Sequence, residues 1–416
     1  MEIIFSVFLI LFTIIGYYEF HKLVNPITIF VSWSLLIMLM GLWSNIFITN
    51  YSLSVYLIII ISYVVFVIGT LLGNRTTIKK SSNKKVDFNR LKKCIYFLSI
   101  IVDVCIIIYI YGLASSFGIS RILSDLSEYN MAIQDGYFSG KLYYQMLFLA
   151  IPLSLFILYF LLKVKNKRNL FMKIQFLVCF LPFISVRRDT LFKMILLNMI
   201  LWYLLGVFNQ SEKRINRKFK KYIKILFILI ITVSFMSITQ KLLNKSIDIT
   251  NMNILGIKIP DFLISPIVYL LGSFPYFNNI FVDISYKGFL ISTLRIPYMY
   301  LQPFWGGIID LTNPFSLSFR SIATGMNLMY NTAPIQYYTL IELGYFYPIF
   351  YFILGIFSGF LYKKFINNQG FSETMWVVII FSLLFWSIRE YILVYLSTWI
   401  LIFSVVIVTK IVLIKE

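Results

Sequence analysis

Residues 52–72 have the sequence SLSVYLIIIISYVVFVIGTLL, which contains no charged side chain. A run of about 20 mostly apolar residues is long enough to cross the hydrocarbon layer of a membrane as an α-helix. Similar runs lie at about 2–18, 26–47, 94–114, 142–162, 170–186, 190–207, 222–239, 345–362, 374–388 and 391–409. We therefore expect about eleven membrane-spanning helices, within a range of about 10 to 13.

Composition indicates the same class. The 416 residues are 60% hydrophobic and 13% charged, with a mean hydropathy of +0.85, whereas soluble domains are about half apolar and a quarter charged. We predict an all-α polytopic membrane protein. Its three blocks are an N-terminal group of transmembrane helices (1–239), a long extracytoplasmic segment (240–344) and a C-terminal group of transmembrane helices (345–416).

The net charge of +20 is carried by clusters between the predicted spans. The clusters are Arg75, Lys79, Lys80, Lys84, Lys85, Arg90, Lys92 and Lys93; Lys163, Lys165, Lys167 and Arg168; Lys213, Arg214, Arg217, Lys218, Lys220, Lys221 and Lys224; and Lys363 and Lys364. The positive-inside rule places them in the cytoplasm, where they set topology, with anionic lipid of the bilayer as a further partner. We expect no nucleic-acid partner, a cytoplasmic C-terminus and an outer N-terminus.

One carboxylate, Asp103, falls near the middle of the span 94–114. A charge at this depth is costly and normally faces the bundle interior. It could serve as a proton relay, but a neutral form or a pairing with a neighbouring helix is the commoner role. Lys193 is a candidate partner.

The outer segment 240–344 contains apolar stretches at about 262–282 and 287–308, which are interrupted by prolines. The prolines are Pro266, Pro275, Pro297 and Pro303. A proline in a lipid-facing helix is tolerated only where neighbours satisfy the freed carbonyl. The stretches are either a further pair of spans or broken helices, and the pattern favours interfacial or re-entrant helices.

The residue inventory excludes several chemistries. The chain has one histidine, His21, on the predicted inner side, and no two acidic residues separated by one position. A histidine-based metal site, the carboxylate pair that commonly holds a divalent ion, and Ser-His-Asp chemistry on the outer face are therefore not expected. A phosphate loop ending in Lys and Ser or Thr is absent as well. We predict neither a metal nor a cofactor.

Arginines near helix ends are the main polar feature of the outer side. Arg187 and Arg188 stand at a turn between spans, and Arg295 and Arg320 lie in the long segment. Guanidinium matches phosphate oxygens bidentately and stays charged, so these arginines predict a diphosphate site. Arg389 beside Glu390 is equally consistent with an ion pair and with a ligand site.

Aromatic side chains are dense around 269–277 and 298–305. Their faces could hold sugar rings, although tyrosine and tryptophan also anchor membrane proteins at the interface. Anchoring accounts for most of the aromatic residues here. The density of the two groups exceeds what anchoring requires.

Several short motifs stand in the outer segments. They are Phe117-Gly118 with Arg121, Gly136-Tyr137-Phe138, Ser185-Val186-Arg187-Arg188-Asp189, Tyr269-Leu-Leu-Gly272-Ser-Phe-Pro275-Tyr-Phe277-Asn278, and Asn331-Thr332 to Glu342-Leu-Gly344. In this order they resemble the bacterial oligosaccharide repeat-unit polymerases, the Wzy-type O-antigen and capsule polymerases. The sequence departs from the family at Glu342, where the pattern has Asp, and in the spacing after Asn331-Thr332.

The resemblance implies a glycosyltransferase of the bacterial cytoplasmic (inner) membrane that acts on its outer face. It would join polyprenyl-diphosphate-linked oligosaccharide units into lipopolysaccharide O-antigen or capsule, without a metal, and with a chain-length regulator protein as a partner. The implied diphosphate ligands are Arg187, Arg188, Arg295 and Arg320. Glu342 is the implied base, with Asp261 and Asp283 as rivals, although Asp261 better fits a turn or helix cap. The implied glycan contacts are Tyr269, Phe277, Asn278 and Trp305.

Two other functions stay open. A related O-antigen ligase would share the fold and the chemistry, and the lack of a histidine in the outer loops weighs mildly against it. A lipid-linked oligosaccharide flippase would want two similar halves, short loops and a basic central cavity. The long outer segment argues against this transporter.

Overall fold

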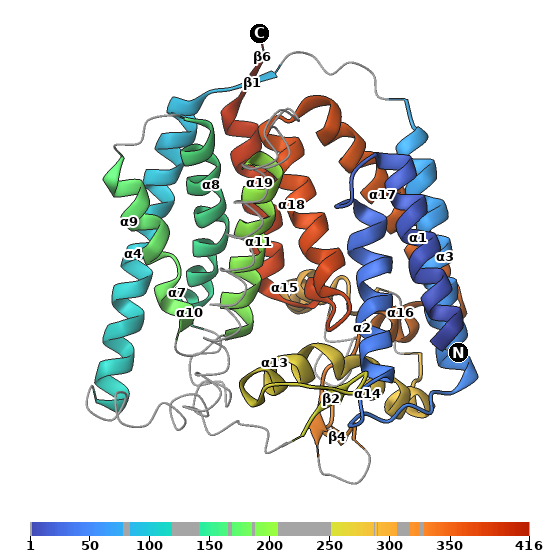
Figure 1. Cartoon of the computed structure of the whole chain (residues 1–416). Coiled ribbons are helices and arrows are strands. Elements are labelled where there is room, and N and C mark those ends of the chain that lie inside the picture. Colours follow the sequence, from blue (N-terminus) through green and yellow to red (C-terminus); the bar gives the residue numbers. More distant parts are fainter. Residues whose placement is uncertain are drawn as a thin grey trace. The chain divides into compact units, whose positions relative to one another are not determined.

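The computed structural model describes residues 2–77, 84–118, 141–164, 169–184, 188–206, 251–286, 288, 290–305, 317–323 and 328–415, and these residues are mainly helical (Figure 1). Six described helical segments are long and apolar enough to cross a membrane: α1 (Glu2–Phe20), α3 (Leu53–Arg75), α4 (Phe88–Phe117), the segment Leu142–Lys163, α11 (Arg188–Gly206) and the segment Ile335–Asn368. The helical membrane class is thereby confirmed. The predicted span 222–239 lies outside the described residues, and the total number of spans stays a prediction.

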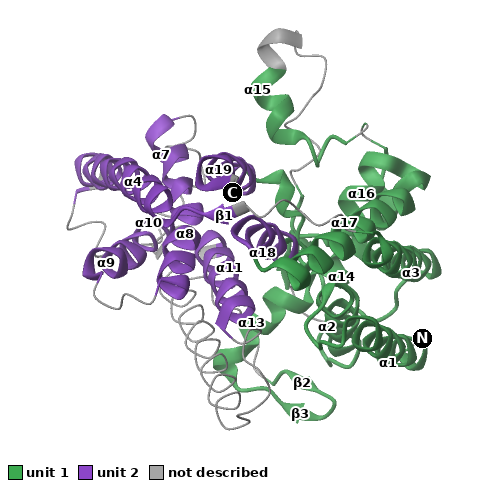
Figure 2. Ribbon diagram, turned by 90° about the horizontal axis from the view of Figure 1, so that it is seen from above, with its two compact units in different colours: residues 1–79, 247–369, 383–395 green, residues 80–246, 370–382, 396–416 purple. Residues whose placement is uncertain are grey.

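Contacts divide the chain into two compact units, coloured separately in Figure 2. Unit 1 consists of 1–79, 247–369 and 383–395, and unit 2 consists of 80–246, 370–382 and 396–416. Each unit combines segments that are far apart in the sequence. The division therefore cuts across the three predicted blocks.

The long helices of unit 1 come from both halves of the chain. They are α1, the π-helical turn η1 (Thr28–Ser32) that continues into α2 (Trp33–Leu42), α3, and α16 (Ile335–Leu343), which leads through η5 (Gly344–Phe346) into α17 (Tyr347–Asn368). Ser52 begins α3, because its hydroxyl accepts from the Val55 amide.

Four glycines bring the backbones of α3 and α17 into direct contact. Gly69 and Gly73 on α3 face Gly355 and Gly359 on α17. A Cβ atom on any of the four would overlap a backbone carbonyl oxygen of the facing helix. Such pairs of glycines four residues apart allow close helix packing in membranes, where dispersion and weak polar contacts replace the hydrophobic effect.

The described part of the long outer segment belongs to unit 1 and folds into short elements. These are the hairpin β2 (Asn253–Ile254) and β3 (Ile257–Lys258), α13 (Asp261–Leu271), α14 (Ser273–Ile280), η3 (Phe281–Asp283), α15 (Arg295–Trp305), and the pair β4 (Arg320–Ser321) and β5 (Met329–Tyr330). An 11-residue helix such as α13 is about 17 Å long, roughly half of the hydrocarbon thickness. In Figure 1, α13 runs across the direction of α2. Short helices are thus present in this segment, although Pro266 lies inside α13 and the boundary with α14 falls at Gly272. Their depth in the bilayer stays a prediction.

Hydrogen bonds and a β-bridge show which elements lie at each end of unit 1. At one end, Trp43 Nε1 donates to Glu2 at 3.2 Å and Ser44 forms a β-bridge with Ile254. At the other end, Lys363 Nζ donates to the Asn74 carbonyl at 2.6 Å. The start of α1 and the β2–β3 hairpin therefore share one end, and the basic end of α17 lies at the other. This arrangement agrees with the predicted alternation of spans.

Unit 2 is built around α8 (Ala150–Lys163), which packs on α4, α9 (Leu170–Val178), α11 and α19 (Leu396–Val412). The other elements are β1 (Lys84–Val86), paired antiparallel with β6 (Leu413–Lys415), and α7 (Leu142–Met146), η2 (Leu147–Leu149) and α10 (Leu181–Ile184).

In unit 2, the carboxylate of Asp103 has a polar partner on a neighbouring helix. Its carboxylate accepts from Gln175 Nε2 of α9 at 2.7 Å, which confirms the expected pairing with a neighbouring helix. Lys193 has a different ion-pair partner, Asp189, at 3.6 Å on the same helix. The partner of Asp103 is therefore the side-chain amide of Gln175. Lys193 forms its ion pair with Asp189 in the first turn of α11.

Candidate functional site

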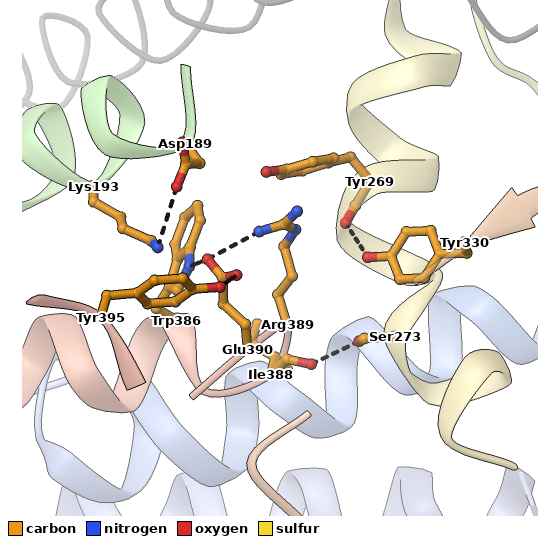
Figure 3. A network of polar contacts seen from close by, with 10 residues as sticks. All are labelled: Asp189, Lys193, Tyr269, Ser273, Tyr330, Trp386, Ile388, Arg389, Glu390 and Tyr395. Atoms are coloured by element: carbon orange, nitrogen blue, oxygen red, sulfur yellow. Dashed lines mark hydrogen bonds and ion pairs between the residues drawn. The ribbon is translucent and has the colours of Figure 1, made fainter. Parts of the chain in front are cut away.

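The candidate site is built on the turn that follows α18 (Phe371–Trp386) and precedes η6 (Ile392–Val394). The amide of Glu390 donates to the Trp386 carbonyl at 3.1 Å, so the chain makes one further turn before it straightens. Neighbouring elements of unit 1 hold this turn. The Ile335 amide donates to the Ser387 carbonyl at 2.8 Å. Figure 3 shows a second such bond, in which Ser273 Oγ donates to the Ile388 carbonyl at 2.6 Å.

Glu390 is a buried carboxylate with strong partners on both oxygens. Trp386 Nε1 donates to Oε1, and Tyr395 OH donates to Oε2 at 2.6 Å. Arg389 Nη1 also lies 3.0 Å from Oε1. Only 3% of Glu390 is exposed, so these contacts replace the water that an ionised carboxylate would otherwise bind.

Arg389 extends from the same turn and is also buried, with 7% of the residue exposed. Its guanidinium lies over the ring of Tyr269 from α13, with 3.5 Å between Cζ and the ring centroid, in the geometry of a cation–π contact. Burial opposes its charge, but the surrounding Tyr269 and Glu390 more than compensate and raise the pKa of Arg389 above its ordinary value. The arginine is therefore charged at every working pH.

Tyr269 is held in place by packing beneath it. Tyr330 OH on β5 donates to the Tyr269 carbonyl at 2.7 Å. This approach requires a glycine at position 272, because a Cβ there would lie 2.7 Å from the Tyr330 ring. Burial raises the pKa of Tyr330, so its hydroxyl stays a neutral donor.

A second polar cluster surrounds Glu342 on α16, which is fully buried. Thr293 donates to it twice, from its amide to Oε1 and from Oγ1 to Oε2, the latter at 2.9 Å. The Tyr391 hydroxyl lies 2.9 Å from Thr293 Oγ1. Glu342, Thr293 and Tyr391 therefore form a continuous hydrogen-bonded chain, in which Thr293 separates the carboxylate from the tyrosine.

Arg295 begins α15, and its charge interacts with Tyr395 and Tyr338. Burial lowers the pKa of Arg295, and the two tyrosines partly offset this effect. Tyr338 is in turn within electrostatic range of Arg389 and Glu390. One of the predicted arginines thus lies in the same neighbourhood as the Arg389–Glu390 turn.

Arg320 on β4 lies at a more exposed position, with 43% of its side chain accessible. It forms an ion pair with Asp283, the rival candidate for the base. Its charge also interacts with Tyr276, whose hydroxyl donates to the Ser318 carbonyl at 2.7 Å. Burial raises the pKa of Tyr276 to about 12. Asp283 is therefore paired with Arg320 in an exposed ion pair.

Two predicted glycan contacts are engaged elsewhere. Phe277 is fully buried, so its ring cannot stack on a sugar in this conformation. Asn278 accepts from the Ser52 amide at 2.9 Å and donates to the Asn50 carbonyl at 3.3 Å, which ties α14 to the start of α3. We correct the assignment of Phe277, whose ring builds the core of unit 1, and the glycan contact of Asn278 stays a prediction.

The remaining predicted residues are only partly described. Trp305 ends α15 and Arg188 begins α11, and the description stops at their backbones. Arg187 lies outside the described residues. Asp261 occupies the first turn of α13, as expected for a residue at a helix start.

Sequence reasoning missed Trp386, Tyr395, Thr293 and Tyr391. One usable signal was present, since Trp386 and Glu390 are four residues apart at a helix end and such pairs share a face. Nothing local in the sequence indicates the contact of Thr293 with Glu342.

Comparisons with known proteins add no family. No protein-family model matches the chain, no curated protein matches it, and no solved structure matches it. Among the described residues there is no group of three or more His, Cys, Asp or Glu side chains that could hold a metal ion. The function must therefore be argued from the site itself.

Proposed function

We propose that the protein is a glycosyltransferase that polymerises lipid-diphosphate-linked oligosaccharide units at the outer face of the bacterial cytoplasmic membrane, to make O-antigen or capsular polysaccharide. The observation that carries this proposal is the grouping of Arg295, Arg389 and several tyrosines at the start of α15 and at the turn after α18. Guanidinium groups bind phosphate oxygens, and tyrosine rings bind sugar faces.

The reaction has a simple balance. A hydroxyl oxygen of the acceptor unit attacks the anomeric carbon of the donor, and the bond between that carbon and the diphosphate oxygen breaks. The lipid diphosphate leaves with the electron pair, and the hydroxyl proton passes to a base. Negative charge grows on the leaving group, so fixed cations near it stabilise the transition state.

Arg295 and Arg320 are the proposed cations from the predicted set. Arg295 is partly desolvated, and a charge in a water-poor site acts more strongly on an arriving anion. Arg320 is half-exposed beside Asp283. An exposed ion pair contributes only about 0.2–1 kcal/mol, so a diphosphate can compete for this arginine at small cost.

Glu342 is the proposed proton acceptor, acting through Thr293. Glu342 is fully buried, so the acceptor hydroxyl does not reach its carboxylate directly in this conformation. The chain from Tyr391 through Thr293 to Glu342 offers a route by which a proton reaches the carboxylate. Thr293 gives its hydroxyl proton to Glu342 and receives one from Tyr391, and Tyr391 receives one from the acceptor hydroxyl. The direction of each hydrogen bond in the chain is reversed afterwards.

The test is a reconstituted polymerisation assay. The purified protein in detergent receives lipid-diphosphate-linked repeat unit from its own bacterial strain, with EDTA present, and products are separated by chain length. We expect a ladder of longer glycans in wild type, a reduction of about 10²–10³-fold in rate for Arg295→Gln, and wild-type rates for the control Arg90→Gln. Arg90 is a suitable control because it is exposed in unit 2 and paired with Asp87.

The assay also distinguishes the transporter. If no ladder forms and the intact lipid-linked unit crosses the bilayer of vesicles that contain the protein, the enzyme proposal is wrong. A ladder that EDTA abolishes would overturn the metal-independent mechanism. Transfer of a preformed glycan to an unrelated acceptor, without a ladder, would identify the ligase.

A further inference from the structure

Arg389 has more hydrogen-bonding capacity than its surroundings use. Its Nε and Nη1 atoms are buried and donate no hydrogen bond to the described residues. The contact of Nη1 with Glu390 at 3.0 Å is an ion pair. The Nε donor has no such partner among the described residues. Leaving a buried donor without an acceptor costs about 1–3 kcal/mol, and an oxygen of a bound ligand would remove this cost.

Glu390 does not depend on Arg389 to satisfy its own oxygens. Trp386 donates to Oε1 and Tyr395 donates to Oε2. The carboxylate therefore stays in place whether or not the arginine binds a second anion. It acts as a fixed counter-charge that helps to orient Arg389.

The ring of Tyr269 fixes the plane of the guanidinium. The 3.5 Å distance between Cζ and the ring centroid restricts the motion of the guanidinium on that side, and Tyr330 OH donates to the backbone carbonyl of Tyr269. A fork held in one plane loses little entropy when it binds a second planar or tetrahedral oxyanion. The arrangement is preorganised for a ligand with two oxygens.

The low exposure of Arg389 limits the size of the group that reaches it. With 7% of the residue accessible, the guanidinium is closed to a sugar ring, and only a small group can reach it, by a local shift of the side chains that cover it. Phosphate and diphosphate oxygens match the fork bidentately and form short charge-assisted hydrogen bonds.

From these contacts we infer that Arg389 binds a phosphate-class oxyanion, with Tyr269 as its platform and Glu390 as its resident counter-charge. Its identity as the diphosphate of the lipid-linked donor rests on the proposed function. Arg389 is then the residue that touches the leaving group. Tyr269, the predicted glycan contact, serves instead to orient the arginine.

The inference is tested by binding to the full-length protein in detergent, measured by calorimetry. The probes are inorganic phosphate, inorganic pyrophosphate and undecaprenyl diphosphate, which separate a free anion from a lipid headgroup. The variants are Arg389→Lys, which keeps the charge and loses the fork, and the double variant Arg389→Gln/Glu390→Gln, which leaves no buried lone charge. Arg90→Gln is the control for loss of a positive charge, and melting temperatures confirm that each variant folds.

We expect wild type to bind pyrophosphate or undecaprenyl diphosphate, Arg389→Lys to bind at least tenfold more weakly, and the double variant to show no binding. Tyr269→Phe, which keeps the ring, should bind as wild type does, and Tyr269→Leu should bind several-fold more weakly. A merely structural role for Arg389 would lower the melting temperature without this difference between Phe and Leu.

The inference is overturned if wild type binds none of the three probes, or if folded Arg389→Lys and the double variant bind as wild type does. Its failure is separable from that of the proposed function. A ladder together with Arg389-independent binding would reject the arginine assignment alone. Arg389-dependent binding of pyrophosphate without any ladder would reject the polymerase and leave the anion site in place.

Discussion

The contact between α3 and α17 allows a quantitative test, because it depends on residues without a side chain. Substituting Gly69 with alanine would place a Cβ atom against the Phe352 carbonyl and 3.1 Å from the Ile356 amide nitrogen. Both are backbone atoms, so no rotamer change can relieve the overlap. The two helices would have to move apart along their whole interface.

The expected magnitude follows from two opposing effects. Glycine to alanine within a helix gains up to about 1 kcal/mol from helix propensity, while overpacking a tight interior costs about 1–3 kcal/mol. Gly41 on α2 is a matched control, since a Cβ there would meet only the Leu271 carbonyl at 3.9 Å. Gly41→Ala should therefore be neutral or stabilising, and Gly69→Ala should be less stable than Gly41→Ala by about 1–3 kcal/mol.

The assay is reversible unfolding in mixed micelles of mild detergent and dodecyl sulfate, followed by tryptophan fluorescence. Gly355→Ala on the facing helix should cost about as much as Gly69→Ala. The double variant Gly69→Ala/Gly355→Ala should cost less than the sum, because the helices separate only once. Equal stability of Gly69→Ala and Gly41→Ala would refute the close approach of α3 and α17.

Three further outcomes are expected. Gly272→Ala should lower the melting temperature, because the new Cβ would lie 2.7 Å from the Tyr330 ring; an unchanged value would contradict this packing. Thr293→Val should cost about 1–3 kcal/mol of stability and reduce polymerisation, since Glu342 loses the hydroxyl donor at 2.9 Å, whereas Thr293→Ser should retain both. Lys363→Met should cost about 0.5–1.5 kcal/mol by unfolding measurements, because Nζ donates to a carbonyl at the end of α3; no loss would show that water replaces the ammonium group.

The fold was largely predictable because membrane helices are specified locally. A described helix overlaps each predicted apolar run except 222–239, which lies outside the described residues. The broken character of 262–308 was also predictable. Pro275 and Pro297 fall in the first turns of α14 and α15, where a missing amide hydrogen costs little.

The compact units could not be read from hydropathy. Hydropathy reports whether a helix crosses a membrane, but it does not report which helix packs against it. The pairing of α3 with α17 depends on Gly69 and Gly73 meeting Gly355 and Gly359, which are far apart in the chain. Each pair is visible in the sequence, but their partnership is a property of the folded chain.

The residue types of the candidate site were predictable from the sequence, but only some of its members were. Arginines and tyrosines of the outer segment were expected, and Arg295 does lie among tyrosines. Sequence reasoning named Arg187, Arg188, Arg295 and Arg320 as the diphosphate ligands. Arg389 received less weight, because an adjacent glutamate offered a local explanation for it.

That local explanation is incomplete, and the reason is geometric. Adjacent Arg389 and Glu390 do form an ion pair, as one alternative held. However, Trp386 and Tyr395 take up the carboxylate oxygens, and Tyr269 reaches the guanidinium from α13. Glu390 therefore does not depend on Arg389 for its own hydrogen bonds, and Nε of Arg389 has no acceptor among the described residues. An opposite charge next to an arginine in the sequence is therefore weak evidence that the arginine has only a structural role. The number of other donors around that carboxylate is more informative about whether the arginine is available to a ligand.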